Sequence, residues 1–188
     1  MKQALVLIDL QCDYLAAAGL QPAAPLLVDI AARLLALARA RGVPVVHVWT
    51  TVERDPDLRM KHWKARGVWK CEAGTAGHAP PAVLAPTHQE LIVHKAHFSG
   101  FGGTLLDGKL RELQAGRIVV AGLHLHACVR TTVLDACQRG LEVRVVEDAV
   151  ASDDPVDAAA TRRYLERRGV DFVTLEAAFA EGDAPAPA

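Results

Sequence analysis

Hydrophobic runs alternate with amphipathic segments along nearly the whole chain. Six runs are apolar with few interruptions, a pattern typical of parallel strands covered on both faces; they lie at residues 4–9, 43–49, 90–95, 117–122, 141–148 and 170–175. Between them, four segments repeat apolar residues at helical spacing and stop at a glycine, at residues 24–42, 104–116, 129–140 and 155–169. Thr104 and one of Asp153 and Asp154 are the expected N-caps, and Pro155 suits a first helical turn.

This β-α-β alternation predicts an α/β fold with three layers, α/β/α, around a mostly parallel, doubly wound sheet of about six strands. Residues 50–89 break the rhythm, because they hold prolines, glycines, three histidines and two of the three tryptophans. We expect them to form an irregular, lid-like excursion over one end of the sheet. We assign residues 1–180 to a single domain and expect the tail, residues 181–188, to be disordered.

Composition and charge exclude several classes of partner. The 188 residues suffice for one sizeable core, and 51% of them are hydrophobic. The net charge is 21 − 22 = −1 without a dense basic cluster, so we expect no nucleic-acid partner. No apolar stretch approaches the roughly 20 residues of a membrane span. Four cysteines without CxxC spacing and without a signal peptide indicate reduced thiols and a cytoplasmic location.

Polar side chains stand where three of the predicted strands end. Asp9 ends the first strand, Lys95 ends the third, and Cys128 follows the fourth within "GLHLHAC". Because open α/β sheets bind ligands at the carboxyl ends of their strands, a carboxylate, an amine and a thiol are expected to meet at one edge. A lone cysteine is usually a small buried hydrophobe. Cys128, however, precedes a predicted helix beside a cation and a carboxylate, which favours an activated nucleophile.

Four segments carry a family resemblance: "LVLIDLQCDY", "CEAGTAGHAPP", "LIVHKAHFSGFGGTLLDGKLREL" and "RIVVAGLHLHACVRTTVLDACQRGLEVRVVEDAVAS". Together they resemble the isochorismatase-like cysteine hydrolases, which include nicotinamidases, N-carbamoylsarcosine amidases and ureidoacrylate amidases. The resemblance implies a triad in which Asp9 is the general base, Lys95 stabilises the thiolate and Cys128 is the nucleophile. It also implies a cis peptide bond between Leu123 and His124, with the backbone N–H groups of His124 and Cys128 as the oxyanion hole.

The same resemblance implies a reaction. An amidohydrolase of this kind would cleave the C–N bond of a small amide, carbamoyl or ureido compound through a thioester on Cys128, releasing ammonia or an amine. Some relatives that cleave a vinyl ether instead lack the nucleophilic cysteine, so its presence favours amide hydrolysis. We expect a homodimer or homotetramer that acts on a small molecule without a cofactor. We also expect the Cys128 thiol to ionise well below the free-thiol pKa of about 8.5.

Six residues are candidate substrate contacts: Gln11, Trp63, Phe98, Phe101, His126 and Arg130. Both phenylalanines match aromatic positions that border the substrate in the family, and Gln11 matches a residue of the first loop. For Phe101 and His126, ordinary packing is an equally good interpretation. The loop from Trp63 to Trp69 is a candidate lid, and a substrate carboxylate would meet Lys64, Arg66 or Arg130.

Nicotinamidases resemble one another in a metal-binding D-x-H motif, followed by further histidines, after the second strand. This chain has "HVWTTVERDPDLRMKHWK" there. His47 and His62 are therefore better interpreted as structural, and His88, His94 and His97 do not restore the spacing. We predict no metal. Two alternatives remain open, a metal-dependent nicotinamidase-like enzyme with a rebuilt metal site and a catalytically silent member that binds a small molecule.

Overall fold

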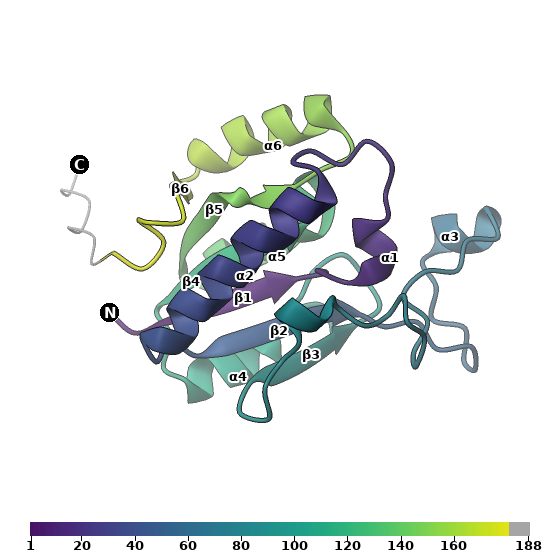
Figure 1. The fold of residues 1–188 in the computed structure, drawn as a ribbon, viewed down its shortest axis with the longest axis horizontal. Coiled ribbons are helices and arrows are strands. Elements are labelled where there is room, and N and C mark those ends of the chain that lie inside the picture. The colour runs from purple at the N-terminus through teal and green to yellow at the C-terminus, as the bar shows by residue number, and fades with distance from the viewer. Residues whose placement is uncertain (181–188) are drawn as a thin grey trace.

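The computed structural model describes residues 1–180, and the tail predicted to be disordered, residues 181–188, lies outside the described residues. Six parallel strands form one sheet in the order β3-β2-β1-β4-β5-β6 (Figure 1). The strands are β1 (Gln3–Ile8), β2 (Val45–Thr50), β3 (Leu91–Lys95), β4 (Arg117–Leu123), β5 (Glu142–Ala151) and β6 (Asp171–Val173). The predicted doubly wound α/β sheet is confirmed.

Helices cover both faces of this sheet. They are α1 (Cys12–Leu15), α2 (Ala24–Ala40), α3 (Lys61–Ala65), the 3₁₀ turn η1 (Ala82–Leu84), α4 (Leu106–Glu112), the π-helical turn η2 (Leu125–Val129), α5 (Arg130–Gln138) and α6 (Pro155–Glu166). Successive side chains of a strand point to opposite faces. In β1, Leu5 and Leu7 join the core under α2, whereas Val6 and Ile8 join the core under α4, α5 and α6. Two covered faces explain why the strands are apolar almost without interruption.

The ends of the helices follow local chemistry. Asp154 accepts the backbone N–H of Asp157 at 2.8 Å, and Pro155 begins α6, as predicted. Helix α4 is shorter than the predicted segment at residues 104–116 and begins after Thr104, whose hydroxyl accepts the N–H of Leu106 at 3.1 Å. Thr104 thus caps the helix from just outside it.

After Thr50, the last residue of β2, the segment to residue 89 holds only the short helix α3, the turn η1 and one isolated bridge between Val52 and Glu72. Figure 1 shows α3 standing beyond the end of the sheet toward which β1, β2 and β3 point. This segment therefore contributes side chains at the edge where ligands bind in open α/β sheets.

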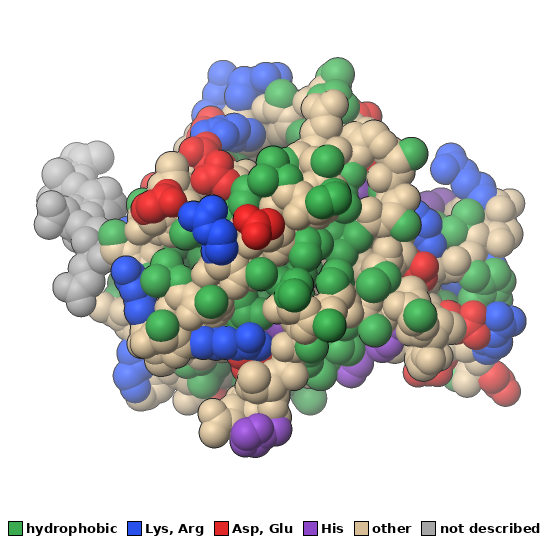
Figure 2. Space-filling view, in the orientation of Figure 1, with side chains coloured by type: hydrophobic (Ala, Val, Ile, Leu, Met, Phe, Trp, Pro, Cys, Tyr) green, Lys and Arg blue, Asp and Glu red, His purple; other side chains and the backbone are tan. Residues whose placement is uncertain are grey.

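Helix α2 keeps apolar side chains on its outer face. Hydrophobic side chains gather over α2 and the elements beside it (Figure 2), and Leu26 in α2 and Val83 in η1 are exposed. The expected homodimer or homotetramer, which would cover such a face, stays a prediction. No helix within residues 1–180 has both the length and the apolar character that crossing a membrane requires.

Gly122 occupies a place in β4 that no side chain can share. Its φ of 130° is rare for residues with a Cβ, and an added Cβ would lie 1.9 Å from the carbonyl oxygen of Ile8 in β1. We expect Gly122→Ala to lower the free energy of unfolding by about 3 kcal/mol or more, because the two central strands would have to separate. Urea denaturation measures this loss.

Gly108, inside α4, is the matched control. A Cβ there meets nothing within 4 Å. Gly108→Ala should raise the free energy of unfolding by about 0.5–1 kcal/mol, since alanine favours the helix. Equal denaturation midpoints for Gly122→Ala and the unchanged protein would contradict the close approach of β1 and β4.

Candidate active site

The carboxyl ends of four neighbouring strands bring polar side chains together. Asp9 follows β1, Thr50 ends β2, Lys95 ends β3, and Cys128 lies in η2 after β4. From β1 the sheet extends through β2 to β3 on one side, and from β4 it extends through β5 to β6 on the other. The boundary between β1 and β4 is thus the topological switch point, where α/β sheets bind ligands.

The ammonium group of Lys95 is the centre of this cluster. Its Nζ lies 2.8 Å from Oδ2 of Asp9, 2.6 Å from Oγ1 of Thr50 and 3.5 Å from Sγ of Cys128, so each of its three N–H bonds has an acceptor. The side chains of Asp9 and Lys95 have no exposed area. Burial alone would lower the pKa of Lys95, but its interactions with Asp9 and with Cys128 together outweigh burial and raise the pKa. The amine therefore stays charged.

The carboxylate of Asp9 is held on both oxygens. Asp9 has a left-handed backbone with a φ of 52°, and its N–H donates to Val48 O at 2.9 Å. Its Oδ1 accepts the backbone N–H and the hydroxyl of Thr50, both at 2.9 Å, while Oδ2 accepts Lys95. Thr50 thus joins the other two side chains. The sequence analysis missed it, although it ends the second strand as Asp9 and Lys95 end the first and third.

Cys128 is buried, with 3% of its surface exposed. Burial and then the negative charge of Asp9 raise its pKa, against the opposing effect of Lys95. The expected low thiol pKa is therefore wrong, because burial and the charge of Asp9 together outweigh the charge of Lys95. Cys128 also lies inside η2, which continues directly into α5, and not in front of the helix. The resting group is a neutral thiol beside a carboxylate–ammonium pair.

Cys128 opens onto a cavity of about 170 Å³, small beside the roughly 300–1,000 Å³ of typical ligand pockets. Its walls are largely aromatic and include Tyr14, Trp63 and Phe98. The Phe98 ring stacks on the His62 ring, with centroids 5.9 Å apart. An adjoining cavity of about 520 Å³ shares His62 and Phe98. A small, flat ligand suits this space.

The predicted substrate contacts divide into two groups. Trp63, Phe98 and His126 line the cavity over Cys128, and Arg130 lines the adjoining one. These four remain candidate contacts. Lys70, which adjoins the candidate lid from Trp63 to Trp69, also lines the cavity over Cys128. Tyr14 and Asp153 line it too and were missed, because the sequence pattern alone gives no sign that their segments meet.

Gln11 and Phe101 lie elsewhere. Both N–H bonds of the Gln11 amide donate to backbone oxygens, of Thr50 at 2.9 Å and His78 at 2.7 Å, so this side chain ties two loops together. Phe101 is buried in the core under α4 and α5, with the guanidinium of Arg139 over its ring at 4.4 Å. Neither residue lines the cavity over Cys128. The Gln11 side chain is held by its hydrogen bonds to the backbone, and the Phe101 ring is packed in the core.

The turn that carries Cys128 begins at a cis peptide bond between Leu123 and His124. The carbonyl oxygen of His124 accepts the N–H groups of Ala127 at 3.0 Å and Val129 at 3.2 Å. The second bond spans five residues and gives η2 its wide, π-helical form. The role of the His124 and Cys128 N–H groups as oxyanion donors stays a prediction.

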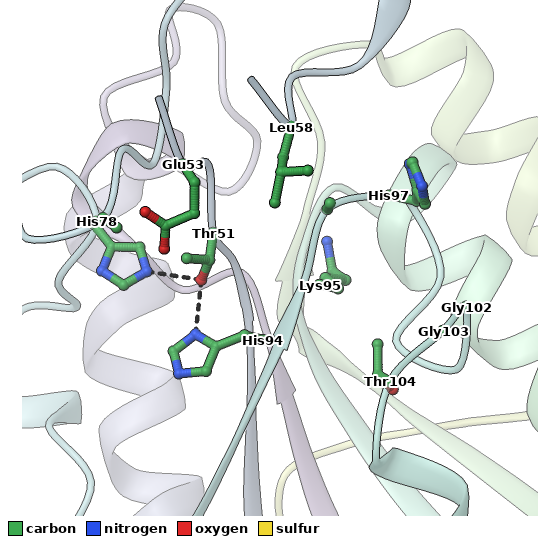
Figure 3. Close-up of a pocket in the computed structure, with 12 residues that line it drawn as sticks. Thr51, Glu53, Leu58, His78, His94, Lys95, His97, Gly102, Gly103 and Thr104 are labelled. Atoms are coloured by element: carbon green, nitrogen blue, oxygen red, sulfur yellow. Dashed lines mark hydrogen bonds between the residues drawn. The ribbon is translucent and has the colours of Figure 1, made fainter. Parts of the chain in front are cut away.

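The residues after β2 do not fit a metal site of the nicotinamidase type. In a separate cavity of about 670 Å³, Oγ1 of Thr51 lies 2.9 Å from Nε2 of His78 and 2.7 Å from Nδ1 of His94 (Figure 3). His47 is buried in β2, with its Nε2 3.0 Å from Oε2 of Glu90. Across residues 1–180, no three His, Cys, Asp or Glu side chains are grouped to hold a metal ion.

Glu90 makes the fold sensitive to acid. Burial alone would raise the pKa of Glu90, but hydrogen bonds from Arg39, the Thr87 N–H and His47 lower it to about 2. A depressed pKa stabilises the folded state above the unfolded value of about 4.3, and that stabilisation is lost as the pH falls toward 2. Glu90→Gln should therefore lower the free energy of unfolding by about 1–3 kcal/mol at pH 7. It should also flatten the decline of that free energy between about pH 5 and pH 2.

Urea unfolding at several pH values measures this effect. Glu112→Gln is the control, because Glu112 is an exposed partner of Lys109 on α4 and should change little. A Glu90→Gln protein with the pH dependence of the unchanged chain would rule out this linkage.

Comparisons with known proteins agree with this architecture. The model of the isochorismatase domain matches residues 3–177. A maleamate amidohydrolase from Pseudomonas putida is 32% identical over 174 residues, covering 84% of this chain and 76% of the relative. Two solved structures are similar: an isochorismatase family protein from Desulfovibrio vulgaris (TM-score 0.84, 32% identity, 94% of this chain and 95% of that one) and N-carbamoylsarcosine amidase from Thermoplasma acidophilum (TM-score 0.82, 29% identity, 97% and 100%).

Proposed function

The chain belongs to the isochorismatase family of hydrolases, and we propose that it cleaves the C–N bond of a small amide, carbamoyl or ureido compound through a thioester on Cys128. One observation carries the proposal. Sγ of Cys128 opens onto a small cavity with aromatic walls and lies 3.5 Å from Nζ of Lys95, which is itself paired with Asp9 at 2.8 Å. Nucleophile, base and cation are thus within reach of one bound carbonyl group.

The raised pKa of the Cys128 thiol determines how attack begins. The neutral thiol gives its proton to Asp9 while Sγ bonds to the substrate carbonyl carbon, so no free thiolate accumulates. Lys95 stays charged and stabilises the negative charge that develops on sulfur. The carbonyl oxygen becomes an oxyanion, for which the backbone N–H groups of His124 and Cys128 are the proposed donors.

Asp9 then returns the proton to the leaving nitrogen, the C–N bond breaks, and ammonia or an amine departs. An acyl thioester on Cys128 remains. A water molecule that gives a proton to Asp9 attacks the thioester carbonyl, and the proton passes to Sγ as the carboxylic acid product leaves. The cycle consumes one water for each C–N bond and restores the thiol.

A panel of primary amides and carbamoyl compounds, assayed for released ammonia, tests this proposal. We expect turnover of at least one short member by the unchanged protein and none by Cys128→Ala. Binding without turnover across the panel would instead favour the catalytically silent alternative. Full activity in Cys128→Ala would exclude the thioester route.

A further inference from the structure

Lys70 is a cation of the cavity over Cys128 that no acidic side chain neutralises. Lys70 is half-buried and forms part of the cavity wall. Within residues 1–180, its Nζ makes no hydrogen bond or ion pair with another side chain, and the ring centroid of Tyr14 lies 6.0 Å away. A half-buried ammonium without a counter-charge is open to an anionic ligand.

The backbone beside Lys70 is fixed in place. The N–H of Cys71 donates to Oδ2 of Asp13 in α1 at 2.6 Å, and the carbonyl oxygen of Cys71 accepts the N–H of Val52 at 2.9 Å. Lys70 therefore reaches the cavity from a rigid attachment and not from a loose loop. Such an attachment lowers the entropy cost of holding a ligand.

The basic residues expected to meet a carboxylate, Lys64, Arg66 and Arg130, do not line the cavity over Cys128. Nζ of Lys64 donates to the carbonyl oxygen of Asp57 at 2.8 Å and lies 3.7 Å from its Oδ2. Arg130 lies over the ring of Tyr164 at 4.9 Å and lines the adjoining cavity. Neither Lys64 nor Arg66 lines the cavity over Cys128.

The carboxylate in the same cavity lies beside two histidines. Oδ1 of Asp153 lies 3.1 Å from Nδ1 of His124 and 4.0 Å from Nε2 of His126. Burial lowers the pKa of His124, so this ring stays neutral near pH 7. Asp153 thus lies beside two imidazole rings, whereas within residues 1–180 Lys70 forms no hydrogen bond or ion pair with an acidic side chain. An uncharged ligand would leave that ammonium without a partner, and a carboxylate would satisfy it.

We propose that Lys70 binds a carboxylate of the substrate, and that the substrates are short amides with a carboxylate a few bonds from the scissile carbonyl, such as monoamides of small dicarboxylic acids. The inference rests on the proposed function, because the ligand is taken to be the amide that Cys128 attacks. The cavity of about 170 Å³ limits the length of the acid. Selection by charge then separates acid amides from the diamides of the same length.

Calorimetric binding to the Cys128→Ala protein tests the proposal without turnover. The probes are oxamate, malonamate, succinamate and glutaramate, each beside its own diamide. We expect the best acid amide to bind more tightly than its diamide. Lys70→Met should weaken the binding of the acid amide about ten- to a hundredfold and leave the binding of the diamide nearly unchanged. Lys70→Arg should retain most of the preference for the acid. Lys64 is a nearby surface lysine, and Lys64→Met is the control. It should change neither the affinity for the acid amide nor the affinity for the diamide.

Three results would overturn this assignment. The first is an equal loss of affinity for the acid amide and for its diamide in Lys70→Met. The second is an equal affinity of the parent protein for every acid amide and its diamide. The third is that no acid amide binds at all. Ammonia release by the protein with Cys128 present is measured separately on the same compounds. Absence of Cys128-dependent release would refute the proposed reaction, while the binding preference would still decide the role of Lys70.

Discussion

Cys128→Ala should lower the rate of amide hydrolysis by about 10⁴-fold or more, because it removes the sulfur atom that forms the proposed covalent intermediate. The change removes one sulfur atom from a buried position in the turn η2 and adds no charge. It should therefore leave the fold intact. Initial rates of ammonia release, with circular dichroism to check the fold, measure both expectations.

Cys137→Ala is the matched control for this substitution. Cys137 lies in α5, the helix that follows Cys128, and packs at the edge of the core under α4, α5 and α6 without lining the cavity. Its activity should equal that of the unchanged protein. If both alanine variants lost activity to the same degree, the loss would come from the helix and not from a missing nucleophile.

The positions of the clustered polar side chains could be predicted because they follow from a rule about strands. Near-continuous apolar runs identify strands covered on both faces, and the carboxyl ends of parallel strands lie at one edge. Asp9, Lys95 and Cys128 were found in this way. The same rule applied to the second strand would have found Thr50, whose hydroxyl joins Asp9 to Lys95.

The cavity wall could not be predicted in the same way. Lys70 comes from the irregular residues 50–89, whose course depends on contacts distant in sequence, such as the bond from the Cys71 N–H to Asp13. Repeating patterns carry no information on such contacts. Of the contacts that the family resemblance implies, Gln11 and Phe101 do not line the cavity over Cys128, since a matching residue type does not show which way its side chain points.

The thiol pKa shows a second limit. The sequence revealed a cation and a carboxylate near Cys128 but not that they neutralise each other at 2.8 Å in a site without exposed area. Charge balance and burial are properties of the assembled site. They raise the pKa of the Cys128 thiol, whereas a helix end and a nearby lysine alone would lower it.

Asp9→Asn should make Cys128 react with iodoacetamide at a lower pH than in the unchanged protein, although amide hydrolysis is lost. Asp9 raises the pKa of the Cys128 thiol through its charge and its hydrogen bond, whereas Lys95 lowers it. Asparagine removes the negative charge and leaves the positive one. The thiolate then becomes the counter-ion of Lys95, and the thiol pKa falls.

Alkylation rates across a range of pH, with the modified peptide identified by mass spectrometry, follow Cys128 apart from the other three cysteines. Lys95→Met is the opposing variant and should raise the thiol pKa further, although it leaves the buried carboxylate unpaired at a cost of about 3–5 kcal/mol. A thiol in Asp9→Asn that ionises at the same pH as before would show that Asp9 does not set its proton affinity. The expected combination in Asp9→Asn is a thiol that ionises at a lower pH and the loss of amide hydrolysis. General damage to the site would not increase thiolate formation. This combination therefore assigns the lost activity to the missing proton acceptor.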